Sequence, residues 1–340
     1  MSDAIVTLKH GAGGRAMRRL IGEVLAAGFA EFPVDGVGLA AMDDGAALRV
    51  GDRWLVITTD AHVVQPPFFP GGDIGRLAIA GTVNDLAMMG ACEPLGLASA
   101  VILEDGFPRA DLERIQRSIV EACREAGVPI VTGDTKVMGR GELDGIAITT
   151  TGVALAPAVV RDNGLAPGDR LIVTGPMGDH GMALLALRHG LALEAELCSD
   201  VAPLNGLVRR ALDAAGGTVT AMKDPTRGGV ASALHEMAEK SGVGIVVDEA
   251  AVPVTPAVRS AAELLGLDPF HLANEGVALI GVRAEGGARV LDAIRTHPLG
   301  RRAALVGECI AEHAGRVVLD TGLGRRLLAE LEGEPLPRIC

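Results

Sequence analysis

Aromatic side chains are scarce in this sequence. They make up 2% of the residues, and tyrosine is absent. Proteins that bind single-stranded nucleic acids stack bases on aromatic rings, so this class is disfavoured. Basic residues are also in deficit, with 31 Lys and Arg against 43 Asp and Glu and a formal net charge of −12. That balance argues against nonspecific binding of nucleic acids or anionic membranes, although backbone N–H groups can still build a local anion site.

Cysteine is sparse as well, and its spacing excludes two kinds of site. The five cysteines include no C-x-x-C pair, so the sequence has neither a zinc-finger pattern nor the framework of a disulfide-rich secreted domain. We recognise no apolar run of membrane-spanning length and no secretory leader. Cys340 does not stand in a prenylation box. We therefore expect a protein of the reducing cytoplasm that binds neither membranes nor nucleic acids.

Helix-like and strand-like segments alternate along the chain. Runs rich in Val, Ile, Leu and Thr predict strands over 53–59, 95–103 and 146–155. Apolar residues at steps of three and four predict a helix over 109–126, and we expect a second helix over 75–90. This mixture predicts an α+β fold with at least two sheets.

The length of 340 residues favours two domains over one large core. A stretch over 155–168 is rich in Pro and Gly and shows no periodicity, which marks a boundary. We predict an N-terminal domain over 1–157, a C-terminal α+β domain over 158–332 and a mobile tail over 333–340.

Carboxylates recur in segments of small or apolar residues. They are Asp43 and Asp44 in "AMDDGAAL", Asp60 in "ITTDAHVV", Asp85 after Asn84 in "GTVNDLAMM", and Asp134 in "VTGDTKVM". A carboxylate in such surroundings needs a hydrogen bond, an ion pair or a cation. Each one alone is equally well a turn former or a helix cap. Together they favour a shared Mg²⁺ site, because Mg²⁺ with a nucleotide takes a few carboxylates plus phosphate oxygens.

Two glycine-rich stretches each precede a predicted helix. "KHGAGGRAM" spans residues 9–17, and "DPTRGG" spans 224–229 with Asp224 and Arg227. The N-terminal end of a helix presents N–H donors and the positive end of its dipole, which suits phosphate. The first stretch matches neither a P-loop nor a dinucleotide fingerprint, so a plain turn is an equal alternative.

The sequence finishes on "EGEPLPRIC". Pro335 and Pro337 favour extended conformations, and eight residues reach up to about 25 Å in that state. We expect an exposed thiol at Cys340 on a swinging arm. A disordered segment without a role is the alternative.

These motifs, in this order and over nearly the whole chain, resemble the PurM-like superfamily of aminoimidazole ribonucleotide (AIR) synthetase-like, ATP-dependent enzymes. Within it the terminal "PRIC" resembles the HypE family, the carbamoyl dehydratases of [NiFe]-hydrogenase maturation. The resemblance implies a homodimer in which the N-terminal sheets of two subunits form a barrel-like interface. It also implies that ATP and Mg²⁺ bind in the first domain.

The resemblance assigns roles to individual residues. The residues with catalytic roles are Cys340, which carries the substrate, Lys136, Glu275 and Asp85. The nucleotide-binding residues are Gly11, Gly13, Gly14, Asp44, Asn84, Thr135, Asp224 and Arg227. The metal ligands are Asp43, Asp60, Asp85 and Asp134. Lys136 and Glu275 are the proton-handling pair, and which of them takes the proton is left open.

The implied reaction dehydrates a carbamoyl group on Cys340 to a thiocyanate. A carbamoyltransferase, HypF, loads the group, and an iron-carrying HypC–HypD complex receives the cyanide. Selenophosphate synthetase is disfavoured because its catalytic Cys or selenocysteine stands in the N-terminal segment, whereas the first cysteine here is Cys92. Two rival functions stay open. One is that of an AIR synthetase, which needs no C-terminal Cys, and the second is that of a non-catalytic nucleotide-binding scaffold.

Overall fold

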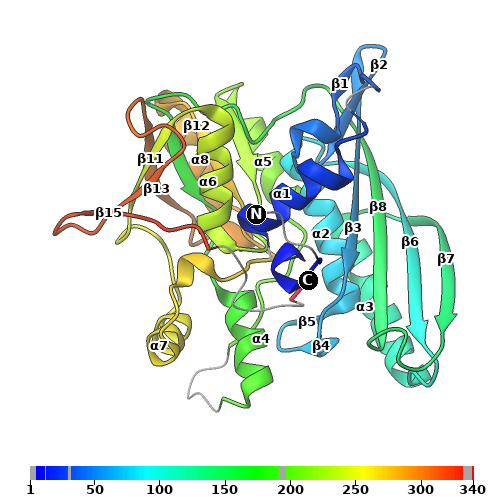
Figure 1. The fold of residues 1–340 in the computed structure, drawn as a ribbon. Coiled ribbons are helices and arrows are strands. Elements are labelled where there is room, and N and C mark those ends of the chain that lie inside the picture. The colour runs from blue at the N-terminus through cyan, green and yellow to red at the C-terminus, as the bar shows by residue number, and fades with distance from the viewer. Residues whose placement is uncertain (1–4, 12, 30–31, 192–196, 332–338) are drawn as a thin grey trace.

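The computed structural model describes residues 5–11, 13–29, 32–191, 197–331 and 339–340. Two sheets lie on opposite sides of the molecule with helices packed between them (Figure 1). The predicted α+β class is confirmed. The predicted domain boundaries and the barrel-like interface between subunits stay predictions. Residues 333–338 of the predicted tail lie outside the described residues.

The first sheet has six strands in the order β1-β2-β3-β8-β6-β7. Their bounds are β1 Gly36–Val37, β2 Ala46–Val50, β3 Arg53–His62, β6 Pro94–Glu104, β7 Ile130–Met138 and β8 Ile146–Ala156. The three strands predicted from the sequence correspond to β3, β6 and β8. Strand β7 pairs in parallel with β6 after a crossover through a helix, and it forms one edge of the sheet.

The second sheet has seven strands in the order β10-β12-β9-β13-β11-β14-β15. Their bounds are β9 Arg170–Val173, β10 Val219–Lys223, β11 Gly244–Asp248, β12 Leu279–Val282, β13 Ala304–Ile310, β14 Val317–Asp320 and β15 Arg325–Leu327. A two-stranded ribbon, β4 Phe68–Phe69 with β5 Gly72–Asp73, lies apart from both sheets.

The described α-helices are α1 Gly14–Leu20, α2 Ile74–Met88, α3 Arg109–Ala126, α4 Asp179–His189, α5 Asn205–Ala215, α6 Gly229–Ser241, α7 Pro256–Leu265 and α8 Gly287–Arg295. The predicted helices 75–90 and 109–126 correspond to α2 and α3. No helix in the described part of the chain is long and apolar enough to cross a membrane.

Helix α2 lies at the centre of the molecule. Thirteen of its 15 residues are buried, which is typical of a helix packed on every side. Asp73 caps it by accepting a hydrogen bond from the backbone N–H of Arg76 (2.9 Å). One face packs on the first sheet, while Ala87 and Met88 join a core cluster with α5. We call the part that contains the first sheet the first half and the part that contains the second sheet the second half. A polar residue on α2 is therefore held where the two halves meet.

Candidate active site

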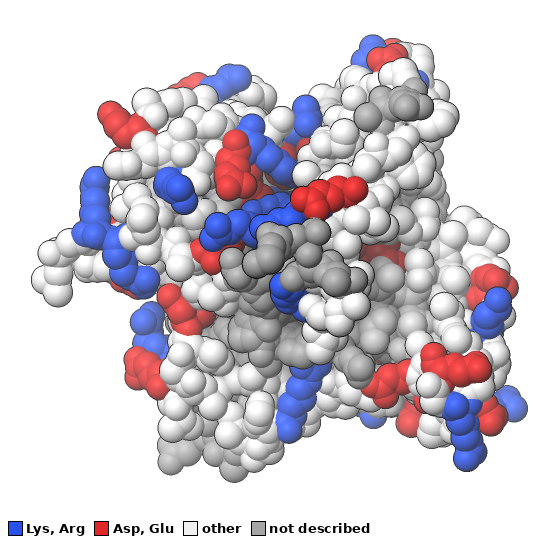
Figure 2. All heavy atoms as spheres, viewed as in Figure 1, with Lys and Arg blue, Asp and Glu red and all other residues white. Residues whose placement is uncertain are grey.

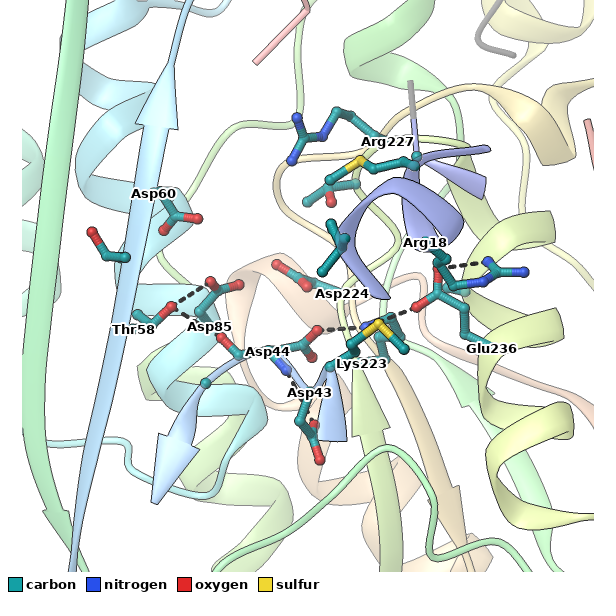
Figure 3. A pocket seen from close by; sticks show the side chains of 18 of the residues that line it. Arg18, Asp43, Asp44, Thr58, Asp60, Asp85, Lys223, Asp224, Arg227 and Glu236 are labelled. Carbon is teal, nitrogen blue, oxygen red and sulfur yellow. Dashed lines mark hydrogen bonds and ion pairs between the residues drawn. The ribbon is translucent and has the colours of Figure 1, made fainter. Parts of the chain in front are cut away.

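A cavity of about 580 Å³ opens where the two halves meet (Figure 3). Its walls come from α1, the segment before β2, strand β3, helix α2, the end of β10 and helix α6. The charged residues that line it are Arg18, Asp43, Asp44, Asp60, Asp85, Lys223, Asp224, Arg227 and Glu236, and the glycines Gly13 and Gly14 lie at its edge near α1. Most carboxylates that the sequence singled out are thus brought together.

Three acidic positions are fixed by neighbouring hydroxyls or backbone groups. Asp85 projects from α2 and accepts a hydrogen bond from the hydroxyl of Thr58 (2.8 Å). Asp60, near the end of β3, accepts one from Thr82 Oγ1 (2.9 Å). Asp43 Oδ1 accepts from the backbone N–H of Asp44 (3.1 Å). The side chains are therefore oriented before any ligand binds.

The carboxylates raise one another's pKa. Burial, followed by the charges of Asp60, Asp224 and Asp44, raises the pKa of Asp85 well above its usual value. Burial raises the pKa of Asp44 to about 8 and that of Asp224 to about 6, against the opposing effect of Lys223. Asp44 Oδ2 and Asp224 Oδ2 are buried without a hydrogen-bond partner in the described structure. Six carboxylates line the cavity against three basic side chains, and this excess of negative charge favours the binding of a cation.

Lys223 is the basic residue at the centre of this acidic wall, and the sequence interpretation missed it. Its Nζ lies 2.5 Å from Asp44 Oδ1, 3.4 Å from Glu236 Oε2 and 3.7 Å from Asp162 Oδ2. Burial alone would lower the pKa of Lys223, but the carboxylates outweigh it and hold the pKa well above its usual value. Lys223 precedes Asp224 in the "KDPTRGG" stretch, so its place beside that motif was the available signal.

The N-terminal helix α1 covers one side of the cavity. Arg18 pairs with Glu236 of α6 (3.1 Å) and with Glu330 (2.7 Å), and Arg15 also pairs with Glu330 (3.1 Å). Figure 2 shows basic and acidic side chains adjacent to one another across the middle of this face. The sequence interpretation missed Arg18 because its partners lie more than 200 residues away.

Glycine is required where α1 begins. Gly13 has φ +76°, and a Cβ there would lie 2.9 Å from the carbonyl oxygen of Arg227. Gly14 has φ +68°, and its Cβ would lie 2.9 Å from the carbonyl oxygen of Leu331. Gly11 is not among the described lining residues, but its carbonyl accepts a hydrogen bond from Arg227 Nη1 (3.5 Å). The glycines let α1 approach the second half closely.

Asn84 has a different place from the one predicted. It is fully buried and does not belong to the described lining of the cavity. Its amide donates to the carbonyls of Ala202 (3.2 Å) and Glu275 (3.3 Å) and accepts from the N–H of Leu204 (2.7 Å). Asn84 therefore joins α2 to two loops of the second half, and its contact with a nucleotide stays a prediction.

Asp134, Thr135 and Lys136 also lie outside the cavity of their own subunit. They belong to the edge strand β7, whose residues Ile130–Val137 are exposed. Parallel pairing with β6 carries β7 away from α2 and the second half (Figure 1). The expectation that these three residues share one site with Asp85 is not met within a single chain.

Glu275 and Cys340 do not belong to the described lining of the cavity. Glu275 is buried, and its Oε1 has no hydrogen-bond partner among the described residues. Burial, then the charges of Asp224 and Asp200, raises its pKa well above the usual value. Cys340 is half-buried and packs against the main core cluster rather than being exposed as expected.

The carboxylates fit a metal that shares its ligands with a nucleotide. Among the described residues, no group of three or more His, Cys, Asp or Glu side chains is arranged to hold a metal ion. Magnesium bound with a nucleotide needs only one or two carboxylates, since phosphates and water complete its shell. The unpartnered oxygens of Asp44 and Asp224 are donors of that kind.

Two family models match the chain. The model for the N-terminal domain of AIR synthase related proteins covers residues 42–156, and the model for the C-terminal domain covers residues 166–320. A carbamoyl dehydratase HypE from Cupriavidus necator is 49% identical over 98% of this chain and 95% of its own length.

The chain belongs to the HypE family of AIR synthase related proteins. The resemblance drawn from the sequence motifs is thereby confirmed.

Solved HypE structures share the fold over most of the chain. A HypE–HypF complex matches with a TM-score of 0.85 and 42% identity over 92% of this chain and 99% of that one. A HypE structure in complex with ATP matches with a TM-score of 0.81 and 42% identity over 99% of this chain and all of the other. The HypE family thus includes members solved with ATP and with HypF.

Proposed function

We propose that this chain is an ATP-dependent carbamoyl dehydratase that converts a carbamoyl group on the Cys340 thiol into a thiocyanate. The family supports the reaction, since relatives 47–49% identical carry the name carbamoyl dehydratase HypE. The observation that carries the proposal is the cavity, which is lined by several carboxylates together with the basic residues Lys223 and Arg227 (Figure 3). Such a site suits the polyphosphate of ATP together with a divalent cation.

The chemistry needs a better leaving group than hydroxide. The carbamoyl oxygen accepts the γ-phosphoryl group of ATP and then leaves as phosphate, while nitrogen loses its two protons and the C≡N bond forms. Of the predicted proton-handling pair, Glu275 is buried and its pKa responds to Asp224 and Arg227, which line the cavity, whereas Lys136 is exposed on the edge strand β7. We propose Glu275 as the proton acceptor.

The cation is Mg²⁺ in this proposal. Asp44, Asp60, Asp85 and Asp224 would hold it, with Asp43 behind them paired to Arg161 Nε (3.3 Å). Bound there, Mg²⁺ would neutralise charge on the phosphates during transfer. Arg227 and the Gly13–Gly14 turn lie at the edge of the cavity where they can contact the phosphates.

Stability should depend on pH in a way that Mg²⁺–ATP reverses. The pKa values of Asp44 and Asp224 are raised to about 8 and about 6. The native state therefore keeps protons that the unfolded chain has already lost near pH 4, so the free energy of unfolding falls as pH rises toward about 8. Mg²⁺–ATP should raise Tm more at pH 8 than at pH 6 in scanning fluorimetry. Equal gains at both pH values, or an equal gain from ATP with EDTA, would contradict a cation site.

The Gly13 turn gives a test of the cavity wall. Gly13→Ala should weaken ATP binding by about tenfold, because the left-handed backbone and the approach to Arg227 tolerate no Cβ. Gly22→Ala is the matched control, since a Cβ there meets nothing within 4 Å. Calorimetric titration with Mg²⁺–ATP measures both variants. Unchanged affinity in Gly13→Ala would remove α1 from the binding site.

The partners follow from the reaction. We propose that a HypF carbamoyltransferase loads Cys340, since a HypE relative has been solved in complex with HypF. We propose a HypC–HypD complex carrying iron as the cyanide acceptor, and the cytoplasm as the compartment, where Cys340 stays reduced.

We propose that the chain forms a homodimer through the first sheet. Val131 and Val137 on the edge strand β7 are 64% and 65% exposed, and an unpaired apolar edge is usually covered. In such a dimer Asp134, Thr135 and Lys136 would reach the cavity of the second subunit. Sedimentation at the 34.8 kDa of one chain at micromolar concentration would contradict this.

The mass of the peptide that ends in Cys340 tests the proposed function. Incubation with HypF, carbamoyl phosphate and ATP should add one carbamoyl group, and the adduct should then lose one water only when Mg²⁺–ATP is present. If the carbamoyl adduct persists in the presence of Mg²⁺–ATP, the protein is a carrier or scaffold without dehydratase activity.

A further inference from the structure

His180 contacts the backbone immediately before Cys340. It stands in the first turn of α4 and is fully buried. Its Nε2 lies 2.8 Å from the carbonyl oxygen of Ile339, whose side chain is 1% exposed within the main core cluster. Cys340 packs against the same cluster. The two described residues that end the chain are thus seated in a formed site.

The hydrogen bonds fix the tautomer of His180. A carbonyl oxygen only accepts, so Nε2 must carry the proton and donate to Ile339. Nδ1 is then an acceptor, 2.8 Å from the hydroxyl of Ser199, which itself accepts from the N–H of Val201 (3.1 Å). Phe69 packs edge-on against the ring at 5.4 Å between centroids. The ring has one orientation and one donor available for the chain end.

The site adjoins the loop that carries Glu275. The N–H of Gly181 donates to the carbonyl of Ala273 (3.0 Å), which holds the start of α4 against that loop. Next to Ser199, the carboxylate of Asp200 accepts from the N–H of Glu275 (3.0 Å). The segment that orients His180 therefore also orients Glu275.

We propose that His180 is a positioning residue that docks the Ile339 carbonyl and so holds Cys340 beside the Glu275 loop for dehydration. This inference rests on the proposed function. The hydrogen bond from His180 involves only the backbone carbonyl of residue 339, and the apolar side chain of Ile339 holds the chain end in the core cluster. Nothing in it depends on what sulfur carries, so thiol, carbamoyl and cyano forms of Cys340 dock alike. That property suits a carrier whose cargo changes during the cycle.

The docking contact has a direct chemical readout. Iodoacetamide labelling of Cys340, followed by peptide mass spectrometry, reports how often the chain end leaves the site, and Cys123 on α3 is the internal reference. His180→Ala should raise Cys340 labelling by about 3- to 10-fold, the expected effect of one lost hydrogen bond. His180→Gln, whose amide can donate to the same carbonyl, should restore part of the protection. His189→Ala, an exposed histidine of the same helix, is the control.

The second readout is the single-turnover conversion of carbamoylated protein. His180→Ala should slow water loss by a similar factor, while the ATP affinity stays unchanged and loading by HypF becomes no slower. Labelling equal to wild type in His180→Ala would overturn the proposal. So would parallel losses of Tm and ATP affinity that His180→Gln does not rescue, because these mark a purely structural histidine.

A further variant covers the case in which His180→Ala does not fold. Ser199→Ala removes the Nδ1 partner together with the acceptor for the N–H of Val201, and it should raise Cys340 labelling about threefold. Unchanged labelling would contradict the tautomer argument. Labelling requires neither ATP nor a carbamoyl group, so it tests the docking site separately from the reaction. If the variants show the expected labelling but the wild-type protein converts no carbamoyl group, the docking site is supported and the dehydratase function is rejected.

Discussion

Cys340→Ser should bind ATP as the wild type does and should form no carbamoyl or cyano adduct. A serine hydroxyl is almost wholly protonated at neutral pH, whereas a few per cent of a thiol is ionised and strongly nucleophilic, so loading should fall on the order of 10³-fold or more. Intact-mass spectrometry after incubation with HypF, carbamoyl phosphate and ATP gives the measurement.

Cys123→Ser is the matched control for this substitution. Cys123 is also half-buried, but it lies on α3, away from the cavity lining. The control should load and convert normally. A carbamoyl adduct on another residue of Cys340→Ser, followed by loss of water, would show that the chain carries its substrate elsewhere.

Asp85→Asn should have opposite effects on activity and stability. The variant should accept the carbamoyl group but dehydrate it about 10²- to 10³-fold more slowly, since one fixed charge is missing where the phosphoryl group is transferred. Without ligands its Tm at about pH 8 should rise, because burial and three neighbouring carboxylates already disfavour the charged form of Asp85. Asparagine keeps the size and the contact with Thr58.

Two measurements check this pair of effects, and Asp52→Asn, at an exposed turn, is the control. Single-turnover mass spectrometry follows water loss, and scanning fluorimetry without ligands follows Tm. Wild-type conversion in Asp85→Asn would remove Asp85 from the catalytic site. A lower Tm at pH 8 would show that Asp85 is stabilised in the free protein by a favourable partner.

The sequence predicted best those site residues whose position depends on a single strand or helix. Asp60 stands near the end of the long strand β3, and Asp85 stands on a helix whose apolar surroundings predict burial. A carboxylate in such a segment must face other polar groups, so their convergence in one cavity was predictable. Asn84 stands on the same helix outside the described lining, because an amide can satisfy a buried position with backbone groups alone.

Strand β7 and Lys223 show what one sequence could not provide. Strand β7 contains Gly133, Asp134 and Lys136, which are poor strand formers, and its conformation comes from pairing with β6. Lys223 reaches Asp44 across 179 residues of sequence. In both cases the structure depends on a contact between segments that are far apart in the sequence, and the residues on either side of each position do not indicate that contact.

The ion pairs that hold α1 against the cavity have a practical consequence for the design of truncated variants. The matched domains run from residue 42 to residue 320, yet Gly13, Met17 and Arg18 form one wall of the cavity, and Arg18 pairs with Glu330. A fragment cut to the domain boundaries would lose β1 from the first sheet and β15 from the second, and its nucleotide cavity would be open on one side. The matched domains are therefore shorter than the segment that encloses the cavity, and only a chain that includes α1 and Glu330 keeps the whole site.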